Sequence, residues 1–494
     1  MWFLQLGRNP IVKSSQAFLC FLLLCAAIFV SMRLLETTNF VNKVAVNPMN
    51  LPLKCSSGNN TRTCPANFYF TGSRKDDDQG VLTPRCPNYF RWIHEDLRPW
   101  KETGITLEMV ERANRTANFR LVVLDGRAYI ETYQKGFQTR DNFTQWGMLQ
   151  LLRRYPGKVP DLDLMFDCVD WPVIRAAEYA GPDAKAPPPL FRYCGNSETL
   201  DIVFPDWTFW GWPETDIGPW ETLSKEIIEG NKKTRWKDRE PYAYWKGNPK
   251  VAEKRKELVK CNVSDQEDWN ARIYIKDWDK ELEQGITQSG LADQCHHRYK
   301  IYIEGSAWSV SQKYILACDS VCLVVTPQYY DFYTRGLLPL QHYWPIRADD
   351  KCRSIKFAVE WGNIHEQKAQ VIGETAVKFI QEDLHMDYVY DYMFHLFNEY
   401  AKLLRYKPTI PEKAVEVCAE TMACPEKGLA KKYMSQSLVN APMDRNPCTM
   451  LPPYDHQGLR WYNLGKDNSF KVVRGWEDNY WEVEQNKINE GQLP

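Results

Sequence analysis

Residues 302–325 read YIEGSAWSVSQKYILACDSVCLVV, and this stretch decides the fold class. A turn of small residues leads into the helical segment QKYILAC, and the apolar run SVCLVV that follows is typical of a buried strand. Working outward, a second strand-like run, ARIYIKDW, occupies 271–278, and a third, DLDLMFDCVDW, occupies 161–171 after a helical segment at 143–157. Strands that alternate with helices predict an α/β fold with parallel sheets.

Other local patterns add elements around this frame. Asp125-Gly126, a preferred pair for a tight turn, separates two strand-like runs and predicts a hairpin over 118–133. Apolar residues at three- and four-residue steps predict helices at 105–113 and 373–404. The last ninety residues lack such a pattern, and we expect an irregular segment that wraps the body.

The size and charge of the chain limit its class. With 494 residues it is long enough for two domains and a tail, and its 62 basic and 63 acidic residues exclude nucleic acid as a partner. No charge interrupts residues 14–32, and a helix of this length spans about 28 Å, close to the ~30 Å of a bilayer core. We expect a single membrane anchor with a cytoplasmic N-terminus; a cleaved signal peptide is the alternative.

Two features predict that the rest of the chain enters the secretory pathway. Thirteen cysteines follow the apolar run, as expected in an oxidising compartment, and the odd number leaves at least one without a partner in the chain. Sequons for N-glycosylation occur at Asn59, Asn114, Asn142 and Asn262. No cysteine or histidine spacing resembles a zinc site, so we expect no structural metal.

Aromatic residues gather beside carboxylates in several clusters, a combination that suits sugar rings. One cluster, FDCVDWP, ends a predicted parallel strand, where an α/β sheet carries its functional groups. Asp170 in this cluster is a candidate general base, with a loop or helix-capping carboxylate as the alternative. Glycoside hydrolysis would need a second carboxylate, but Asp167 is expected on the opposite face of the strand. Asp161 and Asp163 resemble a metal-binding pair, although a solvated loop is the simpler interpretation.

Two further turns suit a nucleotide. The turn at 305–311 would offer a diphosphate its backbone N–H groups and serine hydroxyls at the start of a helix, with Lys313 adding charge; a capping serine is the alternative. In KGNPKVAEKR, the residues Lys246, Lys254 and Arg255 could neutralise a leaving nucleotide, or they could simply be solvated.

Taken together, these clusters resemble the Rumi-type protein O-glucosyltransferases of glycosyltransferase family 90, which also includes fungal capsule-associated xylosyltransferases. The matching strings are FDCVDWP, FPDWTFWGWPE, YWKGN and DQCHHRYKIYIEGSAWSVSQKYILACDS, and the resemblance covers about residues 83–406. It implies a GT-B-like fold, with two Rossmann-like lobes and a donor cleft between them, that needs no metal. The implied reaction moves glucose or xylose from a UDP-sugar to a protein or polysaccharide hydroxyl with inversion. The implied location is the Golgi or ER membrane, as a single-pass type II protein with a lumenal catalytic part.

The resemblance also assigns individual residues. Asp170 takes the place of the catalytic base, and Cys295 and Cys318 that of a family disulfide. The donor-binding positions are Trp212, Ile217, Asn248, Arg255, Ser306, Ala307, Trp308, Ser309, Val310 and Ser311, and the acceptor-contacting positions are Phe137, Thr139 and Arg140. Because Ser311 replaces an arginine of the animal enzymes, a second hypothesis is a catalytically inactive sugar-binding or scaffold member of the same fold.

These inferences combine into one domain order. We expect a cytoplasmic tail at 1–13, the anchor at 14–32, a stem and Cys-containing segment at 33–82, an N-terminal lobe with the catalytic Asp and the acceptor site at 83–222, a nucleotide-sugar-binding lobe at 223–385, and a C-terminal helix with a wrapping tail at 386–494.

Overall fold

Two sheets organise the computed structural model, which describes residues 51–55, 64, 83–181, 184–276, 290–291 and 294–490. The first sheet has the order β11-β2-β1-β3-β4-β5. Its strands are β1 (Phe119–Leu124), β2 (Arg127–Thr132), β3 (Leu162–Phe166), β4 (Leu190–Arg192), β5 (Ile202–Val203) and β11 (Val415–Val417). Asp125 and Gly126 have φ angles of 50° and 73° between β1 and β2, so the predicted hairpin is confirmed.

The second sheet has the order β10-β9-β8-β6-β7 and is parallel throughout. Its strands are β6 (Glu240–Gly247), β7 (Ala271–Ile275), β8 (His297–Tyr302), β9 (Val321–Val325) and β10 (Trp344–Ile346). The prediction of parallel sheets is therefore confirmed here and for β3-β4-β5, but it is wrong for β1. The Asp-Gly turn reverses the chain after β1, so β1 lies antiparallel between β2 and β3. Two sheets in a mixed α/β chain are consistent with a two-lobe fold.

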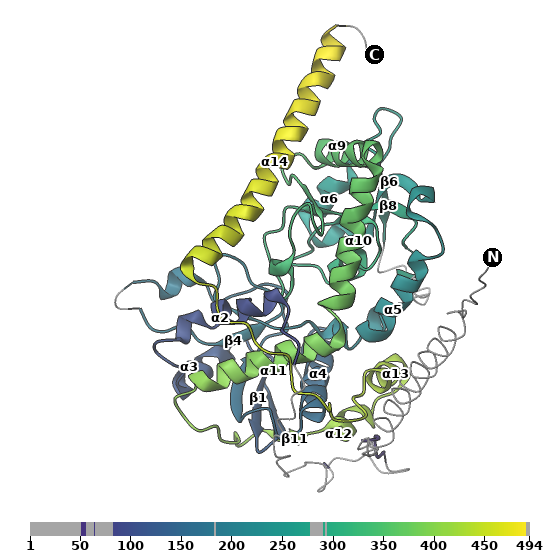
Figure 1. Cartoon of the computed structure of the whole chain (residues 1–494). Helices are drawn as coiled ribbons and strands as arrows, with labels where there is room; N and C mark the ends of the chain where they lie inside the picture. The colour runs from purple at the N-terminus through teal and green to yellow at the C-terminus, as the bar shows by residue number, and fades with distance from the viewer. Residues whose placement is uncertain are drawn as a thin grey trace, which may run out of the picture. The chain divides into compact units, whose positions relative to one another are not determined.

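Helices pack on both sheets (Figure 1). α11 contacts β3 and α4, whereas α9 and α10 contact β9. The helices are α2 (Trp92–Asp96), α3 (Leu107–Arg112), α4 (Arg140–Arg154), α5 (Trp220–Asn231), α6 (Glu253–Val259), α8 (Gln312–Leu316), α9 (Lys351–Ile364), α10 (Glu366–Glu382), α11 (Met386–Leu403), α12 (Ala419–Ala423), α13 (Gly428–Gln436) and α14 (His456–Asn489).

Two predictions about the C-terminal part are wrong. The helix expected at 373–404 is broken after Glu382, which lets α10 pack on the second sheet while α11 packs on the first. The supposedly irregular last ninety residues contain α14, a helix of 34 residues. Val473 and Glu477 are the residues of α14 that are fully buried, and so narrow a buried stripe gives no recognisable apolar pattern in the sequence.

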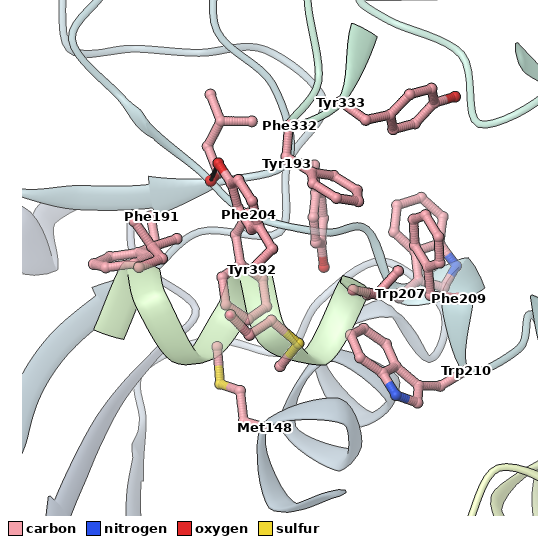
Figure 2. Packing of buried hydrophobic residues seen from close by; sticks show 14 of the residues in the cluster. Met148, Phe191, Tyr193, Phe204, Trp207, Phe209, Trp210, Phe332, Tyr333 and Tyr392 are labelled. Atoms are coloured by element: carbon pink, nitrogen blue, oxygen red, sulfur yellow. Dashed lines mark hydrogen bonds between the residues drawn. The ribbon is translucent and has the colours of Figure 1, made fainter. Parts of the chain in front are cut away.

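Much of the aromatic content lies in the core of the first sheet. Figure 2 shows Phe191, Tyr193, Phe204, Trp207 and other rings of this core packed together with Phe332 and Tyr333, which follow β9 of the second sheet. The two sheets are therefore joined through buried side chains. A large aromatic core, the plain alternative to a sugar site, accounts for the fully buried indoles of Trp100, Trp146, Trp207, Trp210, Trp220 and Trp344.

Among the described residues, five disulfides support this arrangement and are typical of a protein of the secretory pathway. Cys55–Cys424, Cys64–Cys418 and Cys86–Cys448 tie the N-terminal segment to the C-terminal one, and Cys261–Cys352 and Cys295–Cys318 lie in the second sheet region. The predicted anchor at 14–32 and the sequon at Asn59 lie outside the described residues. Among the helices that are described, none combines the length and the apolar character that crossing a bilayer would demand.

Candidate active site

Asp170 lies in the loop after β3, at the carboxyl edge of the parallel strands β3, β4 and β5. Its side chain is 28% exposed, and Oδ1 accepts a hydrogen bond from Nη1 of Arg140 at 2.5 Å. Arg140 opens α4, and its guanidinium lies 4.4 Å above the ring of Trp207 and 5.2 Å from that of Phe137. Within the described part of the chain, Oδ2 of Asp170 accepts no hydrogen bond. Arg140 thus orients the carboxylate through Oδ1, and Oδ2 is available to accept a hydrogen bond from another molecule.

Asp167 has a different environment, although it is only three residues away. It is fully buried, forms an ion pair with Arg192, and accepts a hydrogen bond from the Val169 amide at 2.9 Å. Burial raises the pKa of Asp167, and the charge of Arg192 opposes this shift. Because Asp167 is buried in this ion pair, it cannot act as the second carboxylate that glycoside hydrolysis needs.

The Asp161–Asp163 pair does not form a metal site. Asp163 is buried on β3, where Nε of Arg120 donates to Oδ1 at 2.7 Å and the hydroxyl of Tyr406 donates to Oδ2 at 2.8 Å. Asp161 accepts a hydrogen bond from the Asp125 amide at 2.9 Å. The solvated loop expected for this pair is therefore wrong for Asp163, whose carboxylate belongs to a buried ion pair.

Arg255 lies on α6 and reaches the turn at 305–311. Its Nε donates to the carbonyl of Glu304 at 2.9 Å, and Nη2 donates to the hydroxyl of Ser309 at 3.4 Å. Further hydrogen bonds go to the carbonyls of Asn248 and Ile303, both at 3.3 Å. Among the described residues, no carboxylate forms an ion pair with Arg255, and burial lowers its pKa to about 10. Arg255 is thus a half-buried cation with only neutral hydrogen-bond partners, and a bound anion would supply its counter-charge.

The neighbouring lysines are already neutralised. Lys254 donates to Oε2 of the buried Glu304 at 2.5 Å. Lys313 is also buried, and its ammonium donates to Oδ2 of Asp206 at 3.2 Å and to Thr208 at 2.7 Å. The expected contact of Lys313 with a phosphate is therefore wrong, because its ammonium forms an ion pair with Asp206 in the core. α8 has only five residues, so its dipole adds little to the turn.

The turn itself is held by its serines and by one tyrosine. The hydroxyls of Ser309 and Ser311 lie 3.0 Å apart, and the amide of Ser309 donates to the hydroxyl of Tyr302 at 3.2 Å. Ala307 and Trp308 are buried, whereas Ser306 and Val310 are half-buried. Nε1 of Trp308 is buried and has no hydrogen-bond partner among the described residues, and the same is true of Nε1 of Trp207.

The turn at 136–140 is fastened to the loop at 212–217. Nε1 of Trp212 donates to Oε1 of Gln138 at 2.8 Å, and the hydroxyl of Thr139 donates to Oε2 of Glu214 at 2.9 Å. Trp212 and Ile217 close their loop through paired backbone hydrogen bonds of 2.8 and 3.1 Å. The residues that the resemblance assigned to the acceptor and to the donor therefore meet, and Phe137 stands 65% exposed beside them.

Cys194 connects Asp170 with the turn at 305–311. Its thiol donates to the carbonyl of Asp170 at 3.1 Å, and it also interacts with the backbone of Trp308. Next to it, Gly195 and Tyr330 form an antiparallel bridge between the segments that follow β4 and β9. The backbone of Asp170 is therefore connected to the backbone of the glycine-serine turn through the thiol of Cys194.

The remaining sequence assignments are placed as follows. The side chain of Asn248 accepts a hydrogen bond from the Lys250 amide at 2.8 Å, and Cys295 and Cys318 form a disulfide. Among the sequons, Asn114 is exposed, and Asn142 and Asn262 are half-buried, with Oδ1 of Asn262 accepting from the Ile273 amide at 2.8 Å.

Sequence reasoning missed several residues that shape the site. Gln138, Glu214, Cys194 and Glu304 each act through partners distant in the sequence. No local pattern marks such contacts, because each joins two segments of the chain that only folding brings together.

Comparison with known proteins identifies the family. The family model for glycosyl transferase family 90 matches residues 82–477. The chain is 26% identical to an O-glucosyltransferase rumi homolog of Anopheles gambiae over 336 residues, covering 66% of this chain and 81% of the relative. It is 26% identical to Protein O-glucosyltransferase 1 of Homo sapiens over 341 residues, with coverage of 66% and 82%. O-glucosyltransferase rumi of Drosophila melanogaster is 24% identical over 337 residues, with coverage of 65% and 78%. The chain belongs to glycosyl transferase family 90.

Proposed function

We propose that the chain is an inverting glycosyltransferase that moves glucose or xylose from a UDP-sugar to the hydroxyl of a protein or glycan acceptor. In this proposal the architecture is GT-B-like, with lobes at 83–222 and 223–385 and the donor bound where Arg255 meets the 305–311 turn. Family membership supports the reaction class, and the names of the relatives favour glucose and a protein acceptor.

The observation that carries the proposal is the half-buried guanidinium of Arg255 at the glycine-serine turn, which has no carboxylate partner among the described residues. A diphosphate bound there would give Arg255 the counter-charge that its surroundings lack. The hydroxyls of Ser309 and Ser311 lie beside the same point and can donate to phosphate oxygens. The cation also stabilises the negative charge that grows on UDP as the bond to the sugar breaks.

Asp170 is proposed as the general base. Its free Oδ2 takes the proton of the acceptor hydroxyl while the acceptor oxygen attacks the anomeric carbon. The bond from that carbon to the phosphate oxygen breaks on the opposite side, so UDP leaves and the configuration inverts. Arg140 holds the carboxylate through Oδ1, and the ring of Trp207 packs against the Arg140 guanidinium. General-base help of this kind contributes roughly two to four orders of magnitude in rate.

A Golgi membrane location, with the catalytic part in the lumen, completes the proposal. The disulfides require an oxidising compartment, and the uncharged run at 14–32 would anchor the chain as a type II protein. The ER membrane is the other location that this evidence supports.

Ser311 favours a second candidate, a sugar-binding or scaffold member without catalysis. Its hydroxyl lies next to Ser309 and supplies no positive charge at a position where the animal enzymes carry arginine.

A donor panel separates the two candidates. The full chain, incubated with UDP-glucose, UDP-xylose, UDP-galactose and UDP-N-acetylglucosamine, is expected to release free UDP slowly from one or two donors and faster with a glycan or peptide acceptor array. Binding of UDP without any release from any donor would reject catalysis and favour the scaffold.

A further inference from the structure

A buried carboxylate lies beside the proposed donor site, where a further negative charge would repel a diphosphate. Glu304 follows β8 and is only 2% exposed. Its own carbonyl accepts the hydrogen bond from Nε of Arg255 at 2.9 Å, and the next residue, Gly305, begins the glycine-serine turn. A negative charge at this place therefore needs a structural reason and a compensating positive charge.

The structural reason is the segment that follows β9. Oε1 of Glu304 accepts hydrogen bonds from the amides of Gln328 at 2.9 Å and Tyr329 at 2.7 Å. The next residue, Tyr330, forms the antiparallel bridge with Gly195 through backbone hydrogen bonds of 2.9 and 3.0 Å. A carboxylate suits this role, because it accepts two hydrogen bonds through one oxygen and a third through the other. Glu304 thus fixes the segment that bridges the second sheet to the first.

The compensating charge comes from Lys254. Its ammonium donates to Oε2 of Glu304 at 2.5 Å, and among the described residues it is the cation that pairs with this carboxylate. The side chain of Lys254 is 27% exposed, and its ammonium lies 5.8 Å from the centre of the Tyr329 ring. Lys254 directly precedes Arg255 on α6, so one helix supplies both cations. The pair of Lys254 and Glu304 is neutral as a whole, which leaves Arg255 as the cation without a carboxylate partner in the described part of the chain.

We propose that Lys254 and Glu304 form a charge-compensated pair that positions the donor site. Glu304 holds the segment after β9, and Lys254 cancels its charge, so that the positive charge of Arg255 remains for the diphosphate. Lys254 is then a positioning residue and does not itself contact a phosphate. This inference rests on the donor site proposed above. Without Lys254 the uncompensated carboxylate opposes the diphosphate, because charges in a protein interior interact over several ångströms.

Isothermal titration of the full chain with UDP and with uridine tests this assignment through a double-mutant cycle. Lys254→Met leaves the charge of Glu304 uncompensated and should weaken UDP binding at least about tenfold, while uridine binding changes less than about threefold. Lys254→Met combined with Glu304→Gln removes both charges, and UDP affinity should return to within about threefold of the unaltered chain. The glutamine can still accept the amides of Gln328 and Tyr329, so the segment after β9 keeps its support.

Two single variants complete the cycle. Glu304→Gln alone should bind UDP at least as tightly as the unaltered chain, because it removes a negative charge, and it decides the question even if Lys254→Met does not fold. Lys256→Met is the matched control. Lys256 is an exposed lysine of the same helix that pairs with Glu253, and its replacement should change the affinity for UDP and for uridine less than about threefold.

Three results would overturn the inference while leaving the donor site in place. Unchanged UDP affinity in Lys254→Met would show that its charge is not needed. A double variant that binds UDP as weakly as Lys254→Met would mean that Lys254 contacts the phosphate directly. Weaker UDP binding in Glu304→Gln, with uridine binding retained, would exclude charge compensation. An unaltered chain that binds no UDP would instead refute the donor site itself, and this inference with it.

Discussion

Replacing Arg255 by Gln is the most informative test of the donor site. Its guanidinium is half-buried, and among the described residues it has only neutral hydrogen-bond partners, so a bound diphosphate would be its counter-ion. A charge-assisted hydrogen bond is worth about 1.5–3 kcal/mol, and two unit charges about 4 Å apart interact by about 4 kcal/mol at an effective dielectric constant near 20. Taking about 2–4 kcal/mol, Arg255→Gln should weaken UDP binding about 30- to 1,000-fold.

Isothermal titration of the full chain with UDP and with uridine measures this effect. Uridine lacks the diphosphate, so its weaker binding should be nearly unchanged by Arg255→Gln. Lys256→Gln is the matched control. It removes the same charge from the next residue of α6, but the side chain of Lys256 faces solvent and pairs with Glu253. It should change UDP affinity less than about threefold.

Two results would refute this reasoning. An unchanged UDP affinity in Arg255→Gln would mean that the diphosphate binds elsewhere. An equal loss of UDP and uridine binding, together with a lower unfolding temperature, would show that Arg255 only supports the backbone carbonyls of Asn248, Ile303 and Glu304.

Two further predictions concern stability. Burial lowers the pKa of His342 to about 4, and its Nδ1 accepts a hydrogen bond from the Leu338 amide at 2.9 Å. The unfolded chain therefore binds more protons between pH 6.5 and 4, and the free energy of unfolding should fall over this range by up to about 3 kcal/mol. His342→Asn should flatten that decline in urea titrations and exposed His456→Asn should not; an identical decline in both variants would contradict the assignment. Replacing Cys295 and Cys318 by Ser should cost about 3 kcal/mol in the same titrations, because their disulfide closes a loop of about two dozen residues, and an unaltered midpoint would argue against it.

Local patterns were sufficient for most elements but not for their arrangement. The Asp125-Gly126 pair fixed a hairpin because only a tight turn with positive φ angles joins two adjacent strands this way. The direction of β1 relative to β3 could not be predicted in the same manner, since pairing between strands depends on the whole sheet. α14 was missed for a related reason: its stability comes from a few contacts with distant residues, such as Trp476 with Trp361.

The candidate site shows the same division. The FDCVDWP cluster led to Asp170 because a strand end followed by proline places a carboxylate at a sheet edge. The role of each lysine could not be predicted from local sequence in this way. The position of Lys313 suggests a phosphate ligand, yet its ammonium forms an ion pair with Asp206, more than one hundred residues away. Electrostatic roles depend on partners that folding brings together, so they require the structure.

The catalytic role of Asp170 is tested most directly by Asp170→Asn. The measurement compares the turnover number for UDP-sugar with the dissociation constant for UDP in the full chain, beside Glu178→Gln, which removes a charge from an exposed position in the same loop. We predict that Asp170→Asn lowers the turnover number by about two to four orders of magnitude and changes UDP affinity less than about threefold, while Glu178→Gln changes neither. Turnover that survives in Asp170→Asn, or a parallel loss of UDP binding, would contradict the account.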